Sequence, residues 1–182
     1  MSYHQHPKPF INRIAQTVTL FSAVVILFAV FGSIILVLFG APEAFLLIGF
    51  VVALMIFPLL MQTAVAPAVT VQPEGLTIHP FYWKDQIIPW DDIAAVKVYP
   101  LLPSKDEEIT RKYAVGKKNY RIAEGIMLII PSLPPQYRIA GFFAGERAKP
   151  VIALTNRAHT DYDELVKSVL NYIDPYKCQL EE

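Results

Sequence analysis

Two long uncharged stretches near the N-terminus constrain this chain more than any other feature of its sequence. No Asp, Glu, Lys or Arg occurs from Ile14 to Pro42 or from Ala44 to Pro73, and Glu43 alone separates the two stretches. A helix of about 20 apolar residues spans a bilayer core about 30 Å thick, and a backbone in lipid must satisfy its own hydrogen bonds. The sequence therefore predicts a hairpin of two transmembrane helices, at about 14–39 and 44–65.

Three other interpretations fit apolar runs of this kind: buried core helices, a cleaved signal peptide and re-entrant segments. The apolar region of a signal peptide has ~7–15 residues, and the first run is nearly twice that length. Two such runs in succession would be unusual in a small soluble domain. A membrane hairpin is favoured, and its short connection, residues 40–43, leaves no room for a domain between the helices.

The basic residues that flank the two runs predict the orientation of the hairpin. Lys8 and Arg13 precede the first run, Lys84 and further basic residues follow the second, and the connection carries only Glu43. We therefore expect a multi-pass protein of the cell (inner) membrane with both termini in the cytoplasm. Pro58 either bends the second helix or ends it early, which leaves the exact end of that helix open between residues 58 and 67.

Small residues occur four positions apart in each apolar run, at Ala29 and Ser33 and at Gly49 and Ala53. Small side chains at this spacing let two membrane helices approach each other closely. We expect these four residues at the contact between the helices, although such pairs are also common in any apolar run.

The sequence after Glu74 has the charge density of a soluble protein, and its apolar residues alternate over short segments. Alternation with a period of two, interrupted by Gly and Pro, is typical of half-buried strands. About seven strands are expected, at 69–71, 76–78, 86–90, 93–99, 126–130, 137–143 and 151–155.

One amphipathic helix is expected near the C-terminus, because apolar residues recur at steps of three or four from Tyr162 to Ile173. Thr160 is its expected N-cap, and Pro175 follows its end. A helix after a series of antiparallel strands predicts a sandwich or barrel with the helix packed over one end or face.

The segments Pro73 to Ile78 and Ile87 to Val96 contain Gly-Leu, a hairpin and then Ile-x-Trp-x-x-Ile-x-x-Val. With the junction from Thr155 to Leu165, they resemble bacterial membrane proteins in which a pleckstrin-homology (PH)-like domain follows a two-helix transmembrane hairpin. The resemblance implies an all-β PH-like barrel or sandwich of about seven antiparallel strands with a C-terminal capping helix. The expected divisions are an N-terminal cytoplasmic tail (1–13), the hairpin (14–66), the PH-like cytoplasmic domain (67–176) and a C-terminal tail (177–182).

A basic cluster stands out in the long connection between the fourth and fifth expected strands. Near a bilayer, each basic residue gains about 1 kcal/mol from anionic headgroups, and tyrosines suit the interface. The alternative is a solvated loop that the acidic residues at 106–108 and 124 partly neutralise. The candidate contacts with anionic lipid or a partner are Arg111, Lys112, Tyr113, Lys117, Lys118, Tyr120 and Arg121.

No catalytic or metal-binding pattern is found in the sequence. The four histidines and Cys178 do not have the spacing of a metal site, and Asp91 and Asp92 would point to opposite faces of a strand. No serine lies in a nucleophile elbow, and no Gly-rich phosphate loop occurs. The sequence predicts no catalytic residue, metal or cofactor, and a formal net charge of zero gives no general attraction for nucleic acid.

The expected function is that of a non-enzymatic, membrane-anchored PH-like binding or adaptor module on the cytoplasmic face. Its expected partners are the bilayer and either anionic headgroups or a membrane protein. The alternative is a structural accessory subunit whose hairpin packs against a larger membrane complex.

Overall fold

The computed structural model describes residues 2–54, 65–81, 83–102, 108–110, 112–113 and 121–180. The chain divides into two units, one of residues 8–64 and one that joins residues 1–7 to residues 65–182. The β-rich unit is therefore built from both sides of the hairpin. The segment expected as an N-terminal tail, 1–13, is shared between the two units, because its first residues form a strand and its last residues begin a helix.

Helix α1 (Pro9–Leu38) begins with a proline at its first position, where the missing N–H costs nothing. Its thirty residues make a helix about 45 Å long, which exceeds a bilayer core of about 30 Å. Among the described residues it is the one helix long and apolar enough to cross a membrane. It confirms a long apolar helix in the first expected span and begins five residues earlier than the expected Ile14, whereas its crossing of a membrane stays a prediction.

A tight turn after α1 returns the chain along helix α2 (Ala44–Leu54). Gly40 adopts a positive φ of 91°, and the N–H groups of Gly40 and Ala41 donate to the carbonyls of Val37 and Leu36, both at 3.0 Å. This is the glycine-dependent end that helices commonly use. Over its described residues α2 is about 16 Å long, and the remainder of the second expected span, residues 55–64, lies outside the described residues.

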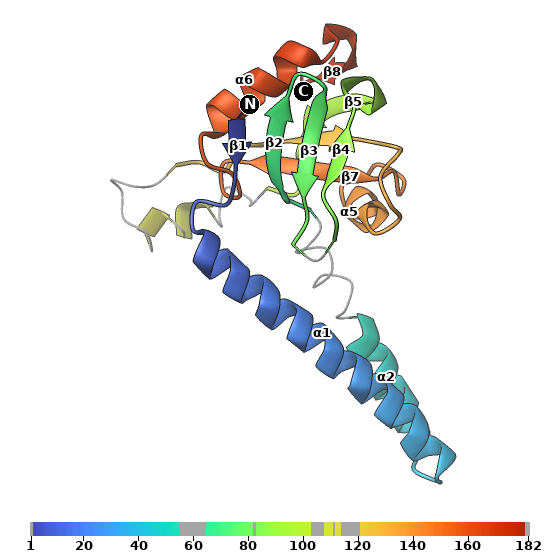
Figure 1. The fold of residues 1–182 in the computed structure, drawn as a ribbon. Helices are drawn as coiled ribbons and strands as arrows, with labels where there is room; N and C mark the ends of the chain where they lie inside the picture. Colours follow the sequence, from blue (N-terminus) through green and yellow to red (C-terminus); the bar gives the residue numbers. More distant parts are fainter. Residues whose placement is uncertain are drawn as a thin grey trace. The chain divides into compact units, whose positions relative to one another are not determined.

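The first sheet of the β-rich unit is antiparallel, with the strand order β1-β2-β3-β4 (Figure 1). Its unexpected member is the edge strand β1, which comes from the residues before α1 and pairs with β2. The hairpin of β2 and β3 around Pro73 and Glu74 was expected and is confirmed. The strands are β1 (Ser2–His4), β2 (Ala68–Gln72), β3 (Gly75–His79) and β4 (Gln86–Ile88).

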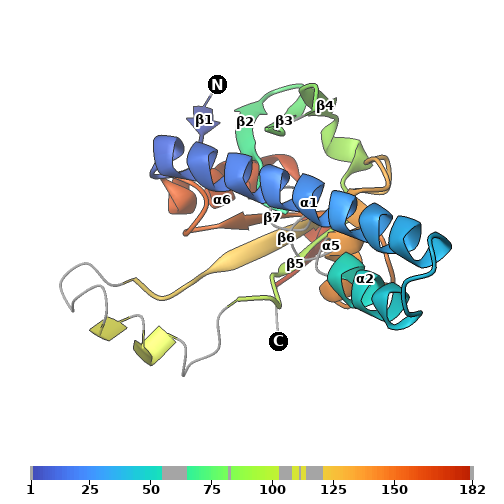
Figure 2. The ribbon, with the colours of Figure 1, turned by 90° about the horizontal axis from the view of Figure 1, so that it is seen from below.

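The second sheet has the order β7-β6-β5-β8, with β5, β6 and β7 side by side (Figure 2). These three strands are antiparallel, whereas β8 pairs in parallel with β5 after the C-terminal helix. The expected tail 177–182 thus contains a strand. The members are β5 (Ala95–Val98), β6 (Gly125–Ile129), β7 (Val151–Thr155) and β8 (Cys178–Gln179).

The expected fold, a barrel or sandwich of about seven antiparallel strands with a C-terminal helix, is confirmed in part, and its barrel form is corrected. The described strands form two separate four-stranded sheets and no closed barrel. Two of those strands, β1 and β8, have only three and two residues. Segments this short carry no periodicity from which a strand could be predicted.

Residues 137–143 were expected to be a strand, and this prediction was wrong: they form helix α5 (Tyr137–Phe143). Their buried members, Tyr137, Ala140 and Gly141, are spaced by three and four residues, as on one face of a helix. The N–H groups of Tyr137 and Arg138 donate to the carbonyls of the two prolines at 134 and 135, which start the helical turn.

Helix α6 (Tyr162–Tyr172) confirms the expected amphipathic helix and buries Tyr162, Leu165 and Val169. Its N-cap is Asp161, with φ 51°, rather than the expected Thr160. The two sheets and α6 share one apolar core. Its largest fully buried apolar side chains outside α5 are Val69, Leu76, Ile78, Ile93, Val96, Leu128, Ile130, Ile152, Leu154 and Leu165.

Short 3-10 turns, η1 (Trp90–Asp92) and η2 (Pro175–Lys177), lead into β5 and β8. Asp91 and Asp92 thus occupy a turn before β5.

Candidate functional site

Strand register brings the two chain connections to the hairpin together at one end of the β-rich unit. His4, the last residue of β1, pairs with Val69, and Ala68, the first residue of β2, pairs with His79 at the end of β3. We call this end, marked by His4, Ala68 and His79, the entry end. The opposite end, at Ser2 and the turn between β2 and β3, is the far end.

A buried histidine bonds to the connection that precedes β2 at the entry end. The ring of His159, which is only 2% exposed, donates from Nε2 to the Pro67 carbonyl at 2.8 Å and accepts at Nδ1 from the Thr155 N–H at 3.2 Å. This bonding is that of a neutral imidazole. Burial lowers the pKa of His159, and it outweighs the opposing effect of these backbone hydrogen bonds.

The residues that precede α1 are tied to the same place. The N–H of Thr160 donates to the Gln5 carbonyl at 2.9 Å, and the Thr160 carbonyl accepts from Nδ1 of the buried His4 at 3.0 Å. Segments 4–5 and 67 therefore both bond to the short turn between β7 and α6, although more than 60 residues separate them in sequence.

The predicted basic cluster belongs to the connection between β5 and β6, and it is described only in part. Arg111, Lys117, Lys118 and Tyr120 lie outside the described residues. Lys112 and Tyr113 are both exposed, and Tyr113 is 77% exposed. The structure thus describes three of the seven predicted residues: Lys112, Tyr113 and Arg121.

Arg121 is not a free cation, because its Nη2 lies 2.6 Å from Oδ2 of Asp163 in the first turn of α6. This hydrogen bond and the charge of Asp163 raise the pKa of Arg121. Both side chains are more than half exposed, so water and salt screen the pair. Of the described basic residues in the cluster, Lys112 is the one for which no ion pair is observed.

Hydrogen bonds from the turn after β7 hold the base of this connection. Asn156 accepts from the Glu124 N–H at 3.2 Å and donates to the Ile122 carbonyl at 2.5 Å. Arg157 donates to the Arg121 carbonyl at 2.7 Å and lies 3.3 Å from the carboxylate of Glu108. Because the same turn continues into His159 and Thr160, the connection leaves the unit at the entry end.

The β3–β4 loop, residues 80–85, also lies at the entry end. Nδ1 of His79 is 2.8 Å from Oδ2 of Asp85, which closes the loop at its base. Nε2 of the same ring is 2.8 Å from Oγ1 of Thr70 on β2. A hydroxyl, an imidazole and a carboxylate in this order occur in hydrolases, but catalysis also needs oxyanion donors and room for substrate. Thr70 is only 7% exposed on its strand, and we assign these bonds to holding the loop.

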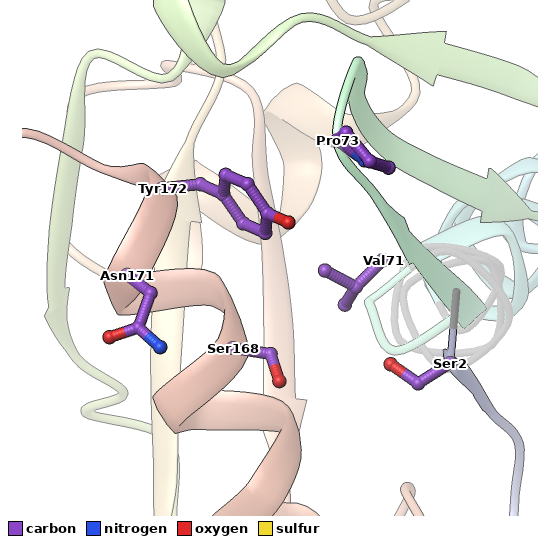
Figure 3. A pocket seen from close by; sticks show the side chains of 6 residues that line it. All are labelled: Ser2, Val71, Pro73, Ser168, Asn171 and Tyr172. Carbon is purple, nitrogen blue, oxygen red and sulfur yellow. The ribbon is translucent and has the colours of Figure 1, made fainter.

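A shallow cavity of about 220 Å³ lies at the far end, between α6 and the first two strands. Figure 3 shows Tyr172 and Ser168 of α6 facing Val71 of β2 and Ser2 of β1 across this hollow, with Pro73 at its rim. The lining contains hydroxyl and amide groups and no charged side chain. It could hold a small neutral group, and it has no charge to select an anion or cation.

Trp90 stabilises the rim of the same cavity. Its Nε1 donates to the carbonyls of Gln72 and Pro73, each at 3.1 Å. Its ring stacks on Tyr172, with centroids 4.9 Å apart and planes 9° apart. The tryptophan that contributes to the PH-like sequence pattern therefore ties the β2–β3 turn to α6.

Two of the four predicted helix-packing residues meet in the hairpin. Ser33 and Gly49 are the buried residues of α1 and α2, and a Cβ at Gly49 would clash with the Ser33 side chain. Ala29 is exposed and Ala53 is half-buried.

Reasoning from the sequence missed β1 and the role of His159. The pattern Val69-Thr70-Val71 gave a signal for β2, but no local signal identifies its partner on the other side of the hairpin. A histidine between a buried strand and an amphipathic helix gives a weak hint of a buried link.

Comparison of the chain with protein-family models, with curated proteins and with solved structures finds no match. The PH-like relationship therefore stays a prediction that depends on the short motifs quoted above.

Proposed function

We propose that this chain is a membrane-anchored, non-enzymatic binding module. Its hairpin crosses the bilayer twice, and its β-rich unit meets anionic headgroups on the cytoplasmic side through the connection between β5 and β6. The β-rich unit shares with PH-like domains its antiparallel strands followed by a C-terminal helix, and this similarity supports a binding role. Because a fold alone does not define a function, the proposal depends on the arrangement of the entry end.

The observation that carries the proposal is the pairing of β1 with β2. These strands lie on either side of the hairpin in sequence, and they are hydrogen-bonded neighbours in one sheet. Residues 4 and 68 must therefore lie on the same side of any membrane, and the chain between them must cross it an even number of times. If α1 crosses, a second crossing follows, and residues 44–64 are numerous enough to span about 30 Å as a helix.

The same pairing argues against a signal peptide that is removed. Cleavage after α1 would separate β1 from the unit and remove the hydrogen bonds from His4 and Gln5 to Thr160. An N-terminal segment that provides an edge strand to the folded unit is better explained as a retained anchor.

The position of the basic connection supports a lipid-binding role. Its base is bound to the turn that also bonds Pro67 and Gln5, and these residues lie just outside the hairpin. Lys112 and Tyr113 are exposed on this connection. Basic residues held close to an anionic surface each contribute about 1 kcal/mol, and this contribution decays within a Debye length.

Labelling of single cysteines tests the two crossings. Cys178 is the sole cysteine of the chain and lies in the β-rich unit; a Glu43→Cys, Cys178→Ser variant moves the thiol to the turn between α1 and α2. We expect a membrane-impermeant maleimide to label Cys178 from the cytoplasmic side and residue 43 from the opposite side. Labelling of both thiols from the same side would contradict the proposal.

Lipid adducts of the full chain, measured by native mass spectrometry in mild detergent, test the headgroup contact. We expect more bound phosphatidylglycerol than phosphatidylcholine, and a loss of that preference when all five basic residues of the cluster become Gln. The matched control removes five basic charges elsewhere and should retain the preference: Arg138, Arg147, Lys149, Lys167 and Lys177. If both variants lose the preference for phosphatidylglycerol equally, net charge alone explains it, and a specific contact through the cluster is contradicted.

The alternative, an accessory subunit of a larger membrane complex, makes a different prediction. A stoichiometric membrane-protein partner should then co-purify in mild detergent, with no preference for anionic lipid.

A further inference from the structure

The β3–β4 loop carries exposed aromatic side chains at the end of the unit where the chain departs for the membrane. Trp83 is 60% exposed, Phe81 is 37% exposed, and Lys84 next to them is exposed as well. Trp and other aromatic residues prefer the headgroup layer of a bilayer, and lysine there meets lipid phosphate.

The reach of the chain limits how far this loop can be from a bilayer. Five Cα–Cα steps separate His4, at the entry end, from Pro9, the first residue of α1, and they extend at most about 18 Å. At about 45 Å, α1 is longer than the bilayer core by about 15 Å, so a crossing α1 also extends into headgroup layers that are each about 5–8 Å thick. Because His79 pairs with Ala68, its loop belongs to the same end of the β-rich unit as both connections.

The base of the loop is also held in place. It is closed by the contact between His79 and Asp85, and His79 is itself anchored to Thr70. Tyr3 of β1 packs its ring edge-on against His79, with centroids 5.5 Å apart. A loop fixed at its base loses little conformational entropy when its tip enters an interface.

We propose that Trp83 and Phe81 insert into the headgroup layer of the membrane that the hairpin crosses, with Lys84 contacting lipid phosphate. This inference depends on the proposed crossing of the hairpin. The occupant of the aromatic surface is the lipid bilayer itself, and the loop fixes the β-rich unit against the membrane at a second point besides the two connections.

The test uses the full chain in nanodiscs that contain phospholipid brominated near the headgroup, because bromine quenches tryptophan at short range. The chain has two tryptophans, Trp83 at the entry end and Trp90 at the far end. We expect brominated lipid to reduce the emission of the native chain, and Trp83→Phe to remove most of that reduction. Trp90→Phe should retain it.

The outcomes separate this inference from the crossing of the hairpin. If cysteine labelling shows two crossings but brominated lipid does not quench Trp83, the loop is not an interfacial anchor, while the membrane hairpin stands. If native chain and Trp83→Phe are quenched to the same fraction, the inference is also overturned. Far-UV circular dichroism of Trp83→Phe should match that of the native chain, because the replaced side chain is exposed.

Discussion

Replacement of His159 by Phe tests how strongly the entry end is held together. The substitution keeps an aromatic ring of similar size and removes both ring nitrogens. The Pro67 carbonyl then loses its donor at 2.8 Å, and the Thr155 N–H loses its acceptor at 3.2 Å. Because the site is buried, little water replaces these bonds.

The expected magnitude follows from the cost of unpaired buried groups. One such group destabilises a protein by about 1–3 kcal/mol, and the carbonyl and the N–H together should cost about 3 kcal/mol. For a unit of about 125 residues, this corresponds to a fall of about 10 °C in Tm. His159→Gln provides an amide that can donate to the Pro67 carbonyl, and its Tm should lie between that of the native chain and that of His159→Phe.

The dependence of stability on pH provides a second, independent readout. Burial lowers the pKa of His159 in the folded state below its ordinary value of 6.5, and the nearby His4 and His6 act in the same direction. Below about pH 6.5 the unfolded state binds this proton more readily than the folded state. The contribution of His159 to stability is therefore fully present above pH 6.5 and decreases as the pH falls, by up to about 1.4 kcal/mol per pH unit.

Tryptophan fluorescence during thermal unfolding in detergent is a suitable assay, because Trp83 and Trp90 both belong to the β-rich unit and the hairpin contains no tryptophan. Between pH 7.5 and 5, the Tm of the native chain should fall more than that of His159→Phe. The difference between the two profiles isolates His159 from the other histidines. An unchanged Tm in His159→Phe, or two parallel pH profiles, would refute the reasoning.

Three further substitutions test packing in the two units. In the hairpin, Gly49→Ala should weaken the contact between α1 and α2 by about 1 kcal/mol, because the added Cβ meets the Ser33 side chain. Gly32→Ala is the control and should leave the contact unchanged, because its Cβ meets nothing within 4 Å. Titration with SDS followed by far-UV circular dichroism measures both variants. Trp90→Phe should lower the free energy of unfolding in urea by about 1–3 kcal/mol, because it removes the donor to two carbonyls; a smaller loss would mean that stacking alone matters. Gly141→Ala should lower the Tm through a clash with the backbone between α5 and β7, at a cost of about 1–3 kcal/mol or more, and an unchanged Tm would contradict that close approach.

The candidate site shows which kinds of inference were possible from local sequence. The basic cluster was predicted from composition, and the turn around Pro73 and Glu74 from its residue types. The pairing of Arg121 with Asp163 was not predictable, because 42 residues separate the two side chains in sequence and only the docking of α6 brings them together. The alternation at 137–143 predicted a strand, whereas the two prolines before it and the packing of Gly141 favour a helix.

The sequence by itself determined that a long apolar helix occupies the N-terminal region. A long run of residues without charge is a local property, and it is typical of a helix that suits a lipid environment. It also determined the β2–β3 hairpin and the amphipathic helix α6, whose patterns repeat over a few residues. Only the tertiary structure decided that residues 2–4 pair with residues 68–72 and that His159 bonds to the connection at Pro67. These contacts join segments more than 60 residues apart, and they stabilise the fold by pairing buried polar groups. A local sequence pattern cannot predict such contacts.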